Sequence, residues 1–442
     1  MSTNFATDIK STLDNCITDM AKNVNLFAKN PGHDFIRNRK LGFTTLMSFL
    51  IGIKGGTLDD EIEDYFSEEE VMSSSAFVQQ RNKLNDYAFP HLLQEFNKRT
   101  SSYDNKKYNG RRILAIDGSD FNIAYNENDD TFVKNQKGIG YNQFHLNAIY
   151  DVLNNTFANI NVQPRSKINE RKACLEMIEE MTFTEPTLLI GDRGYEGYNL
   201  FALIEQKENL DYLIRVKDKG TKLTKSLPMT EFDMDFTVEI RTTQTNEDKE
   251  AYKKGTAIYL PGPSKLGKNV KNIKWTLGSP YELPIRVVRF KIAKDKYETI
   301  ITSLSYKEFP LEEIKKMYHK RWAIETGFRW LKYAVGTVNF HGKSKFFALQ
   351  EIYAHIIMFN FGMRIMMNVH IKQDANCKYI YKVNHTKAFK YCRKFWCYRG
   401  SSPPNVLRQI RKKKLPIREG RRDMRKQIQA KKFVPYLYRV AA

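Results

Sequence analysis

The sequence predicts an α/β fold in which a mixed β-sheet is flanked by helices. Strand-like apolar segments follow one another at residues 112–117, 144–152 and 156–162. Helical and strand-like segments then alternate at residues 169–181, 187–190, 198–207 and 212–216. Three adjacent strands followed by alternating helices and strands imply a mixed sheet with helices on its faces.

The composition indicates a globular protein with a polyanionic partner. The chain has 442 residues, of which 41% are hydrophobic and 28% charged, so a wholly disordered chain is excluded. At about 150 residues per domain, this length suggests roughly three units. Lys and Arg number 72 against 50 Asp and Glu, and the formal charge is +22. Because phosphates relieve the repulsion among so many cations, this surplus favours a polyanion as partner.

Cysteine usage and hydropathy favour a soluble protein of a reducing compartment. The five cysteines form no C-x-x-C pair and no even framework, so we expect no disulfides. The N-terminal segment contains charged residues and lacks the apolar core of a signal peptide. The most apolar stretch, residues 352–363, has 12 residues, fewer than the roughly 20 that span a bilayer. We therefore expect a cytoplasmic protein.

Residues 1–108 are interpreted as a helical DNA-binding domain. Short helices, one of them basic and capped by the serines at residues 73–75, resemble a helix-turn-helix whose second helix enters the major groove. The DNA contacts predicted in the basic helix are Gln80, Arg81 and Lys83. A small helical bundle without a DNA partner gives the same pattern, so both interpretations stay open.

Residues 217–299 are expected to interrupt the core with a β-rich insertion. Helical periodicity disappears there, and Thr-rich alternation with Gly and Pro residues takes its place. The insertion divides the core into residues 109–216 and residues 300–343. The second part carries a helical pattern that runs to Tyr333.

Residues 344–442 are expected to form a helical region with a basic tail. The last 42 residues hold 13 Lys or Arg and 2 acidic residues, a net charge of +11. The DNA contacts predicted in the tail are Arg418, Arg421 and Arg422. A solvated, disordered cationic arm is the alternative.

The most informative segment is residues 318–332. On one helix, at about 100° per residue, four of its polar residues would lie within an arc of about 60°. These residues are Tyr318, Arg321, Glu325 and Lys332. Because they would span roughly 21 Å, they could follow several phosphates along a strand but could not grip one. An exposed helix face on which Arg321 and Glu325 pair at i,i+4 is the alternative.

Two aspartates at predicted strand ends join Glu325 as candidate catalytic residues. Asp117 and Asp192 each follow a buried strand, and strand ends are where functional sites gather. Two Asp and a Glu in one cleft could hold two Mg²⁺ ions about 3.5 to 4 Å apart for in-line phosphoryl transfer. Without metal such a cluster would repel DNA, so it favours metal-dependent chemistry over passive binding. Asp120 is an alternative ligand, but the predicted strand places Asp117 at its mouth.

These residues resemble the DDE transposases of bacterial insertion sequences, in the family named for insertion sequence 4. The signature of that family is Tyr, two residues, Arg, three residues, Glu, six residues and Lys, and residues 318–332 match it without a gap. Residues 116–119 are similar to its first Asp motif, and residues 191–195 to its second. Residues 144–151 resemble the stretch between the two motifs. The resemblance covers roughly residues 112–332.

The resemblance implies a ribonuclease-H-like catalytic core that the β-rich insertion opens between Asp192 and Glu325. It implies that Asp117, Asp192 and Glu325 bind two Mg²⁺ ions, for which Mn²⁺ substitutes, and that the protein moves DNA by cleavage and strand transfer. The implied partners are the DNA of the transposon ends and of the target, and a second copy of the chain in a synaptic homodimer. The expected location is the cytoplasm, in association with a bacterial nucleoid.

The resemblance also implies DNA contacts around the acidic residues. Contacts with phosphates near the transposon end fall to Tyr318, Arg321 and Lys332, with Arg193 of the second Asp motif. Relatives cut the second strand through a DNA hairpin, while an aromatic residue stacks on a flipped base. For this stacking role Tyr297 is the first candidate and Trp275 the second. Trp322 and Trp330 are interpreted as packing residues.

Two other functions remain as alternatives. The first is a DNA-binding protein derived from a transposase and without catalytic activity, although the intact acidic residues argue against it. The second is a stand-alone nuclease with the same core, which would cut DNA without joining it.

Overall fold

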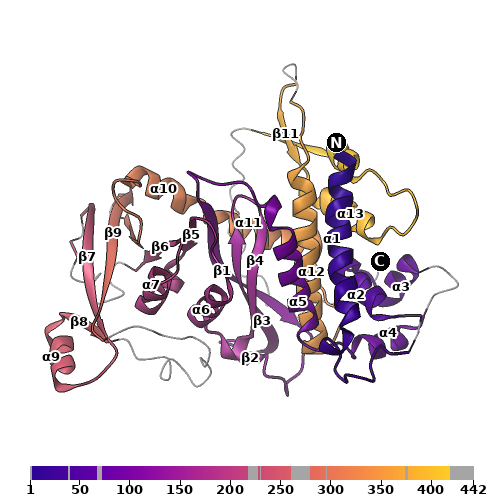
Figure 1. Cartoon of the computed structure of the whole chain (residues 1–442), viewed down its shortest axis with the longest axis horizontal. Helices are drawn as coiled ribbons and strands as arrows, with labels where there is room; N and C mark the ends of the chain where they lie inside the picture. The colour runs from indigo at the N-terminus through magenta and orange to yellow at the C-terminus, as the bar shows by residue number, and fades with distance from the viewer. Residues whose placement is uncertain are drawn as a thin grey trace.

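The computed structural model has a large mixed β-sheet at its centre (Figure 1). It describes residues 2–37, 40–66, 72–217, 227–228, 230–259, 279–294, 296–373 and 377–418. The strands of this sheet are β1 (Arg112–Ile123), β2 (Phe132–Lys134), β3 (Gly140–Asp151), β4 (Thr156–Pro164), β5 (Thr187–Gly191), β6 (Leu210–Val216), β7 (Phe232–Arg241), β8 (Ala257–Tyr259), β9 (Tyr281–Ala293) and β10 (Lys296–Thr302). A separate small sheet pairs β11 (Ile380–Val383) with β12 (Lys414–Ile417).

The strand order confirms the mixed α/β sheet that the sequence predicts. The order is β2-β3-β1-β5-β6-β10-β9-β7-β8, and β4 pairs with β3. β1, β5 and β6 run parallel, whereas β3 and β10 flank them in antiparallel pairing. The parallel strands lie in the middle and are buried on both faces, as is typical of strands joined through helices.

Strand β1 is longer than the sequence predicts. The predicted strand ended at Asp117, but β1 continues beyond it because residues 117–123 pair with β3. The parallel ladder between β1 and β5 does end where expected, at the pair Ile116 and Gly191. Asp117 and Asp192 therefore follow the last pair of one ladder, although Asp117 itself lies within a strand.

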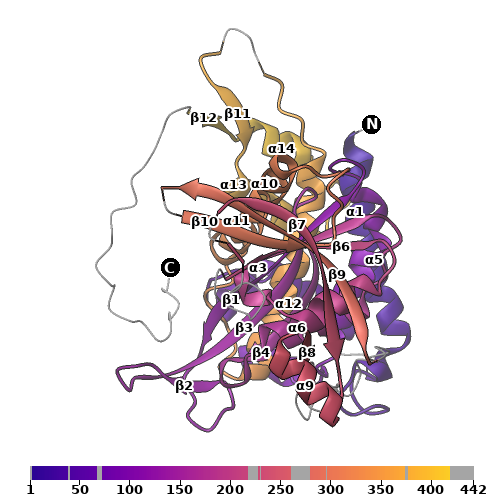
Figure 2. The same cartoon turned by 90° about the vertical axis from the view of Figure 1, so that its left-hand side faces the viewer.

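Helices cover both faces of the sheet (Figures 1 and 2). They are α1 (Ser2–Lys22), α2 (Phe43–Gly52), α3 (Leu58–Tyr65), α4 (Ser74–Arg81), α5 (Ala88–Arg99), α6 (Glu170–Glu180), α7 (Tyr198–Glu205), α9 (Asn246–Lys254), α10 (Leu311–His319), α11 (Trp322–Trp330), α12 (Lys345–Met367), α13 (His385–Cys397) and α14 (Val406–Lys412). Short helical turns lie at Val24–Leu26, Ser101–Tyr103, Arg165–Lys167, Arg193–Tyr195 and, with π geometry, Leu331–Val335. Helices α6 and α7 pack on one face of β1, β5 and β6, while α11, α12 and the N-terminal helices cover the other. None of the helices described here combines the length and the apolar character that a membrane crossing requires.

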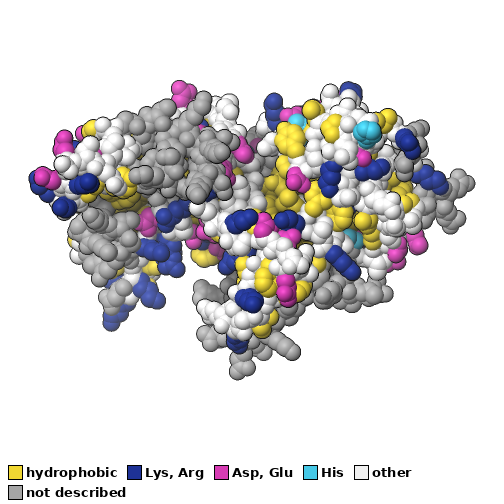
Figure 3. All heavy atoms as spheres, turned by 90° about the horizontal axis from the view of Figure 1, so that it is seen from below, with side chains coloured by type: hydrophobic (Ala, Val, Ile, Leu, Met, Phe, Trp, Pro, Cys, Tyr) yellow, Lys and Arg dark blue, Asp and Glu magenta, His cyan; other side chains and the backbone are white. Residues whose placement is uncertain are grey.

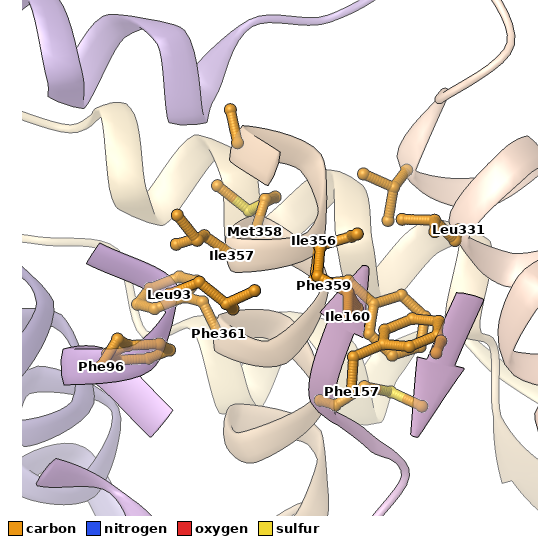
Figure 4. Packing of buried hydrophobic residues seen from close by; sticks show 14 of the residues in the cluster. Leu93, Phe96, Phe157, Ile160, Leu331, Ile356, Ile357, Met358, Phe359 and Phe361 are labelled. Atoms are coloured by element: carbon orange, nitrogen blue, oxygen red, sulfur yellow. The ribbon is translucent and has the colours of Figure 1, made fainter. Parts of the chain in front are cut away.

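Helix α12 is the axis of the helical layer. Seventeen of its 23 residues are buried, so it is enclosed on all sides rather than amphipathic. Helices α1, α2 and α5 pack against it from the N-terminal part of the chain, and α13 from the C-terminal part. Figure 4 shows Leu93 and Phe96 of α5 on one side of α12, and Phe157 of β4 on the other. Both ends of the chain thus share one hydrophobic core with the sheet.

The predicted insertion, residues 217–299, extends the central sheet. Its strands β7 and β9 match the predicted strand pattern, and β10 connects them to β6. The structure adds α9, which the sequence analysis missed. A capping box of Thr245 and Asp248 begins this helix, and Gly255 ends it with a φ of 77°. The helix is mostly charged, so it lacks the apolar periodicity on which the prediction depended.

Candidate active site

Asp117 lies within β1, and Asp192 directly follows β5, the neighbouring parallel strand. The ladder between β1 and β5 ends immediately before both residues. A backbone N–H orients each carboxylate: Gly118 N donates to Asp117 Oδ1 at 2.8 Å, and Gly194 N donates to Asp192 Oδ1 at 2.8 Å. Two carboxylates are thus fixed at the same level of the sheet.

The signature residues do not share one helix. Helix α10 ends and α11 begins within the signature, and a tight turn joins them, in which Arg321 N donates to Tyr318 O and Ile324 N to Arg321 O. Tyr318 therefore belongs to α10, Glu325 to α11 and Lys332 to the π-helical turn after α11. The single helix face predicted from the spacing is wrong, because the tight turn and the π turn both change the rotation per residue.

Arg321 joins two of the three carboxylates. Its Nη1 lies 3.5 Å from Asp117 Oδ2, and its Nη2 lies 3.1 Å from Glu325 Oε1. Burial raises the pKa of Asp117 to about 6, although the Gly118 N–H and Arg321 act in the opposite direction. The nearby charges of Asp192 and Glu325 add to the increase. Asp117 is therefore close enough to Asp192 and Glu325 for their charges to act on it, and Arg321 is the counter-charge between Asp117 and Glu325.

The donor set of this site fits a hard divalent cation. Asp117, Asp192 and Glu325 offer carboxylate oxygens, which are the ligands that Mg²⁺ and Mn²⁺ take in proteins. In the part of the chain that the structure describes, no three Asp, Glu, His or Cys side chains stand close enough to hold one ion. Arg321 lies in contact with both Asp117 and Glu325.

A pocket of about 250 Å³ lies beside Arg321. Tyr318 and Arg321 line it together with Trp322, and the remaining wall comes from α10, β6, β9 and β10. Tyr318 is buried, which raises its pKa. Trp322 is 53% exposed and is therefore not the packing residue that the sequence predicts. Tyr297 does not line this pocket, whereas its neighbour Glu298 does.

Lys332 lies apart from that pocket. Its ammonium is 4.8 Å from the ring centre of Phe121 on β1. Burial lowers the pKa of Lys332, and the nearby charge of Asp120 partly offsets this effect. Arg193 is exposed beside Asp192. The structure thus groups Tyr318 and Arg321 with the carboxylates and places Lys332 further along β1.

A histidine held by two carboxylates lies next to the catalytic candidates. His145 Nδ1 is 2.7 Å from Asp120 Oδ1, and His145 Nε2 is 3.1 Å from Glu170 Oε1. Although burial lowers it, hydrogen bonds to Asp120 and Glu170 raise the pKa of His145 to about 9. Asp120, the alternative metal ligand, is therefore the partner of His145, its cross-strand neighbour on β3.

Glu170, which the sequence analysis missed, braces both Asp motifs. A Cβ atom on Gly118 would lie 2.3 Å from His145 Nε2 and 3.2 Å from Glu170 Oε1. A Cβ atom on Gly194 would lie 3.2 Å from Glu170 Oε2. Each glycine is within two residues of a candidate metal ligand. Because these glycines have no side chain, His145 and Glu170 can approach the backbone of both Asp motifs this closely. The one local feature of the sequence that could have drawn attention to Glu170 is its position at the start of a predicted helix.

The His145 cluster predicts a pH-dependent contribution to stability. The pKa of His145 is raised on folding, so its ion pairs stabilise the protein fully below about pH 6.5 and lose this effect as the pH rises through about 9. His145→Gln should therefore lower the free energy of unfolding by on the order of 2 kcal/mol more at pH 6 than at pH 9.5. Urea denaturation at both pH values measures the difference, with the exposed His33→Gln as control. An equal loss at both pH values would contradict the assignment.

Comparison with known proteins identifies the family. The profile of the family described as "Transposase DDE domain" matches residues 108–361, more than half of the chain. The chain belongs to this family. The matched region contains Asp117, Asp192 and Glu325. The cryo-EM structure of the piggyBac transposase synaptic complex with hairpin DNA is similar, with a TM-score of 0.45 and 12% identity over 90% of this chain and 79% of that chain. No curated protein matches the chain.

The N-terminal candidates of the transposase are mostly buried. Gln80 donates to Leu41 O, and Arg81 is 2% exposed and forms an ion pair of 2.8 Å with Glu351 of α12. Lys83 Nζ donates to Gln80 Oε1 at 2.7 Å. The capped helix exists as predicted, but its polar residues attach it to the rest of the molecule. Gln80 and Arg81 are therefore excluded from the DNA contacts proposed below.

The remaining candidates are at the C-terminal end and in the insertion. Arg418 follows β12, with its guanidinium 6.0 Å from the ring centre of Tyr379. Trp275, Arg421 and Arg422 lie outside the described residues.

Proposed function

We propose that this transposase cuts the ends of an insertion sequence and joins them to a new DNA site, with Asp117, Asp192 and Glu325 as its catalytic residues. The main support is that Arg321 contacts both Asp117 of β1 and Glu325 of α11, while Asp192, which follows β5, lies close enough for its charge to act on Asp117. The signature at residues 318–332 supports the more specific assignment to the group of insertion sequence 4, with a ribonuclease-H-like core.

The carboxylates and Arg321 have complementary roles in this proposal. Divalent metal ions, when bound, polarise the scissile phosphodiester and activate a water or a 3′-hydroxyl. Asp117, Asp192 and Glu325 would hold them through carboxylate oxygens. Arg321 would bind a DNA phosphate, for which its planar guanidinium is well suited. The Tyr318 hydroxyl contacts the same region of the strand.

The pocket beside Arg321 is proposed to receive an unpaired base during hairpin formation. Trp322 is exposed in its wall, so it replaces Tyr297 as the preferred stacking residue. Lys332 and Arg193 are proposed to bind phosphates on either side of the carboxylates. The transposase is further proposed to act as a homodimer on two DNA ends, with basic residues of its tail, Arg418 among them, on the DNA.

Incubation with a labelled duplex that carries the terminal repeats of its own element tests this function. We expect strand cleavage that requires Mg²⁺ or Mn²⁺ and stops with EDTA, followed by joining of the 3′ ends to a plasmid target. Cleavage without joining would instead identify a nuclease. Binding without cleavage in either metal would identify a transposase-derived DNA-binding protein.

A further inference from the structure

On the face shown in Figure 3, the positive charge of the transposase is not confined to one patch. Lys and Arg side chains are interspersed there with Asp and Glu (Figure 3). Net charge alone therefore does not mark a DNA path on that face. A surface for DNA has to be recognised from basic residues that gather where any acidic neighbours already have partners.

A cavity of about 740 Å³ has this property. It lies between α2 and α3 of the N-terminal region and α13 of the C-terminal region, and it shares no lining residue with the pocket beside Arg321. Five of its lining residues are cationic and two are acidic. The acidic residues already have partners: Glu61 accepts from the backbone N–H groups of Lys54 and Gly56, and Asp64 pairs with Lys54.

Helix α13 supplies a row of lysines to this cavity. Lys387, Lys390 and Lys394 are exposed and line it. Their spacing of i, i+3 and i+7 places them within about 60° on one face of the helix, over roughly 10 Å of rise. Helix α13 contains no acidic residue, and among the described residues no carboxylate lies within ion-pair distance of the three ammonium groups. Repulsion along the row is therefore not relieved within the described chain.

Arg393 adds a buried cation to the wall of the cavity. It is 8% exposed, and its Nη2 donates to Val335 O at 2.6 Å. Its Nε is buried and has no hydrogen-bond partner among the described residues. Arg393 therefore contributes positive charge to the wall of the cavity rather than an exposed hydrogen-bond donor.

We propose that the surface formed by Lys387, Lys390, Lys394 and Arg393, the α13 surface, binds the phosphate backbone of duplex DNA outside the catalytic site. The proposal rests on the proposed function, in which DNA is the substrate. One DNA strand carries a phosphate about every 3.4 Å along the helix axis, so the lysine row can follow up to three phosphates. The charge of Arg393 adds to the positive potential beside the row. A single small anion would leave most of the row unused.

The salt dependence of DNA binding tests this surface. The variant Lys387→Gln/Lys390→Gln/Lys394→Gln should bind a labelled duplex, with the terminus and its flanking DNA, on the order of 100-fold more weakly near 0.1 M salt. The slope of log affinity against log salt should decrease by about 2.7, at about 0.9 per lost phosphate contact. Because all three lysines are exposed, the variant should keep the melting temperature of the wild type.

The matched control removes three lysines from another helix. Lys249, Lys253 and Lys254 are exposed on α9, at the opposite end of the molecule from α13 (Figure 1). Their replacement by Gln should leave the slope unchanged. An equal decrease for both variants would show a general charge effect and would overturn the proposal.

The same experiment separates this inference from the proposed function. If the wild type cuts its terminal duplex and the α13 variant keeps the full slope, the α13 surface is not a DNA site although the function stands. If that variant instead loses affinity for polyglutamate, the surface binds an acidic protein, and the proposal is wrong. A wild type that binds duplex with the expected slopes but never cuts it would refute the function and leave the α13 surface supported.

Discussion

Asp117→Asn should reduce cleavage of a terminal duplex at least about 10³-fold while its binding changes little. Loss of a metal ligand removes several kcal/mol of transition-state stabilisation, and each 1.36 kcal/mol is a factor of ten in rate. Asn keeps the shape of the side chain and removes a charge from a buried, acidic site, so folding should not suffer. Asp192→Asn and Glu325→Gln should have the same effect. Single-turnover cleavage and anisotropy of a labelled duplex measure the two quantities.

The matched control for this prediction is Asp120→Asn. Asp120 lies three residues after Asp117 on β1, so the two side chains point to opposite faces of the sheet. Asp120 holds His145, and its replacement should reduce cleavage far less than replacement of Asp117. If Asp120→Asn abolished cleavage while Asp117→Asn retained it, the assignment of the metal ligands would be reversed.

Arg81→Met should destabilise the transposase by about 3 to 5 kcal/mol, the usual cost of leaving a buried charge without its partner. Arg81 and Glu351 are both almost fully buried, with Nη1 2.8 Å from Oε1. Arg81 also donates to Gln350 Oε1 at 2.7 Å, and Glu351 accepts from His341 N at 2.8 Å. The substitution therefore leaves the charge of Glu351 inside the core without its cationic partner. Urea denaturation measures the change.

Two further variants show whether charge burial is the cause. Arg81→Met/Glu351→Met should recover most of the lost stability, because the double variant removes both buried charges. Arg99→Met breaks the partly exposed pair with Asp19 and should cost less than about 1 kcal/mol. A similar small cost for Arg81→Met would show that the buried pair contributes no more than a surface pair.

The sequence predicted those parts of the fold that depend on local patterns. The predicted helix at 169–181 is α6, and the predicted strand at 187–190 is β5. The mixed sheet followed from the order of these elements. The acidic residue Asp117 suggested the end of a strand, but β1 continues beyond it. The length of β1 is set by its pairing with β3, which the local sequence does not reveal. Helix α9 was missed because caps, rather than an apolar stripe, define it.

The candidate site was predictable to a similar extent. Motifs and spacing indicated Asp117, Asp192 and Glu325; in the structure Arg321 contacts Asp117 and Glu325, and the charge of Asp192 acts on Asp117. The brace formed by Glu170 and the burial of Arg81 could not be predicted, because both depend on partners far away in the sequence. Charged residues are mostly exposed in proteins, so the sequence alone predicts that the polar residues of α4 face solvent. Their burial becomes apparent only when their partners in the structure are known.

The enclosure of α12 by helices from both ends of the chain bears on truncated gene products. A product that starts internally, after α5, would leave the apolar residues of α12 open to water, and so would one that stops before α13. Such fragments should aggregate or be degraded rather than persist as inhibitors that occupy DNA without cutting it. A shortened form of the protein could therefore regulate transposition only if another polypeptide covered the apolar residues of α12 in place of the missing helices.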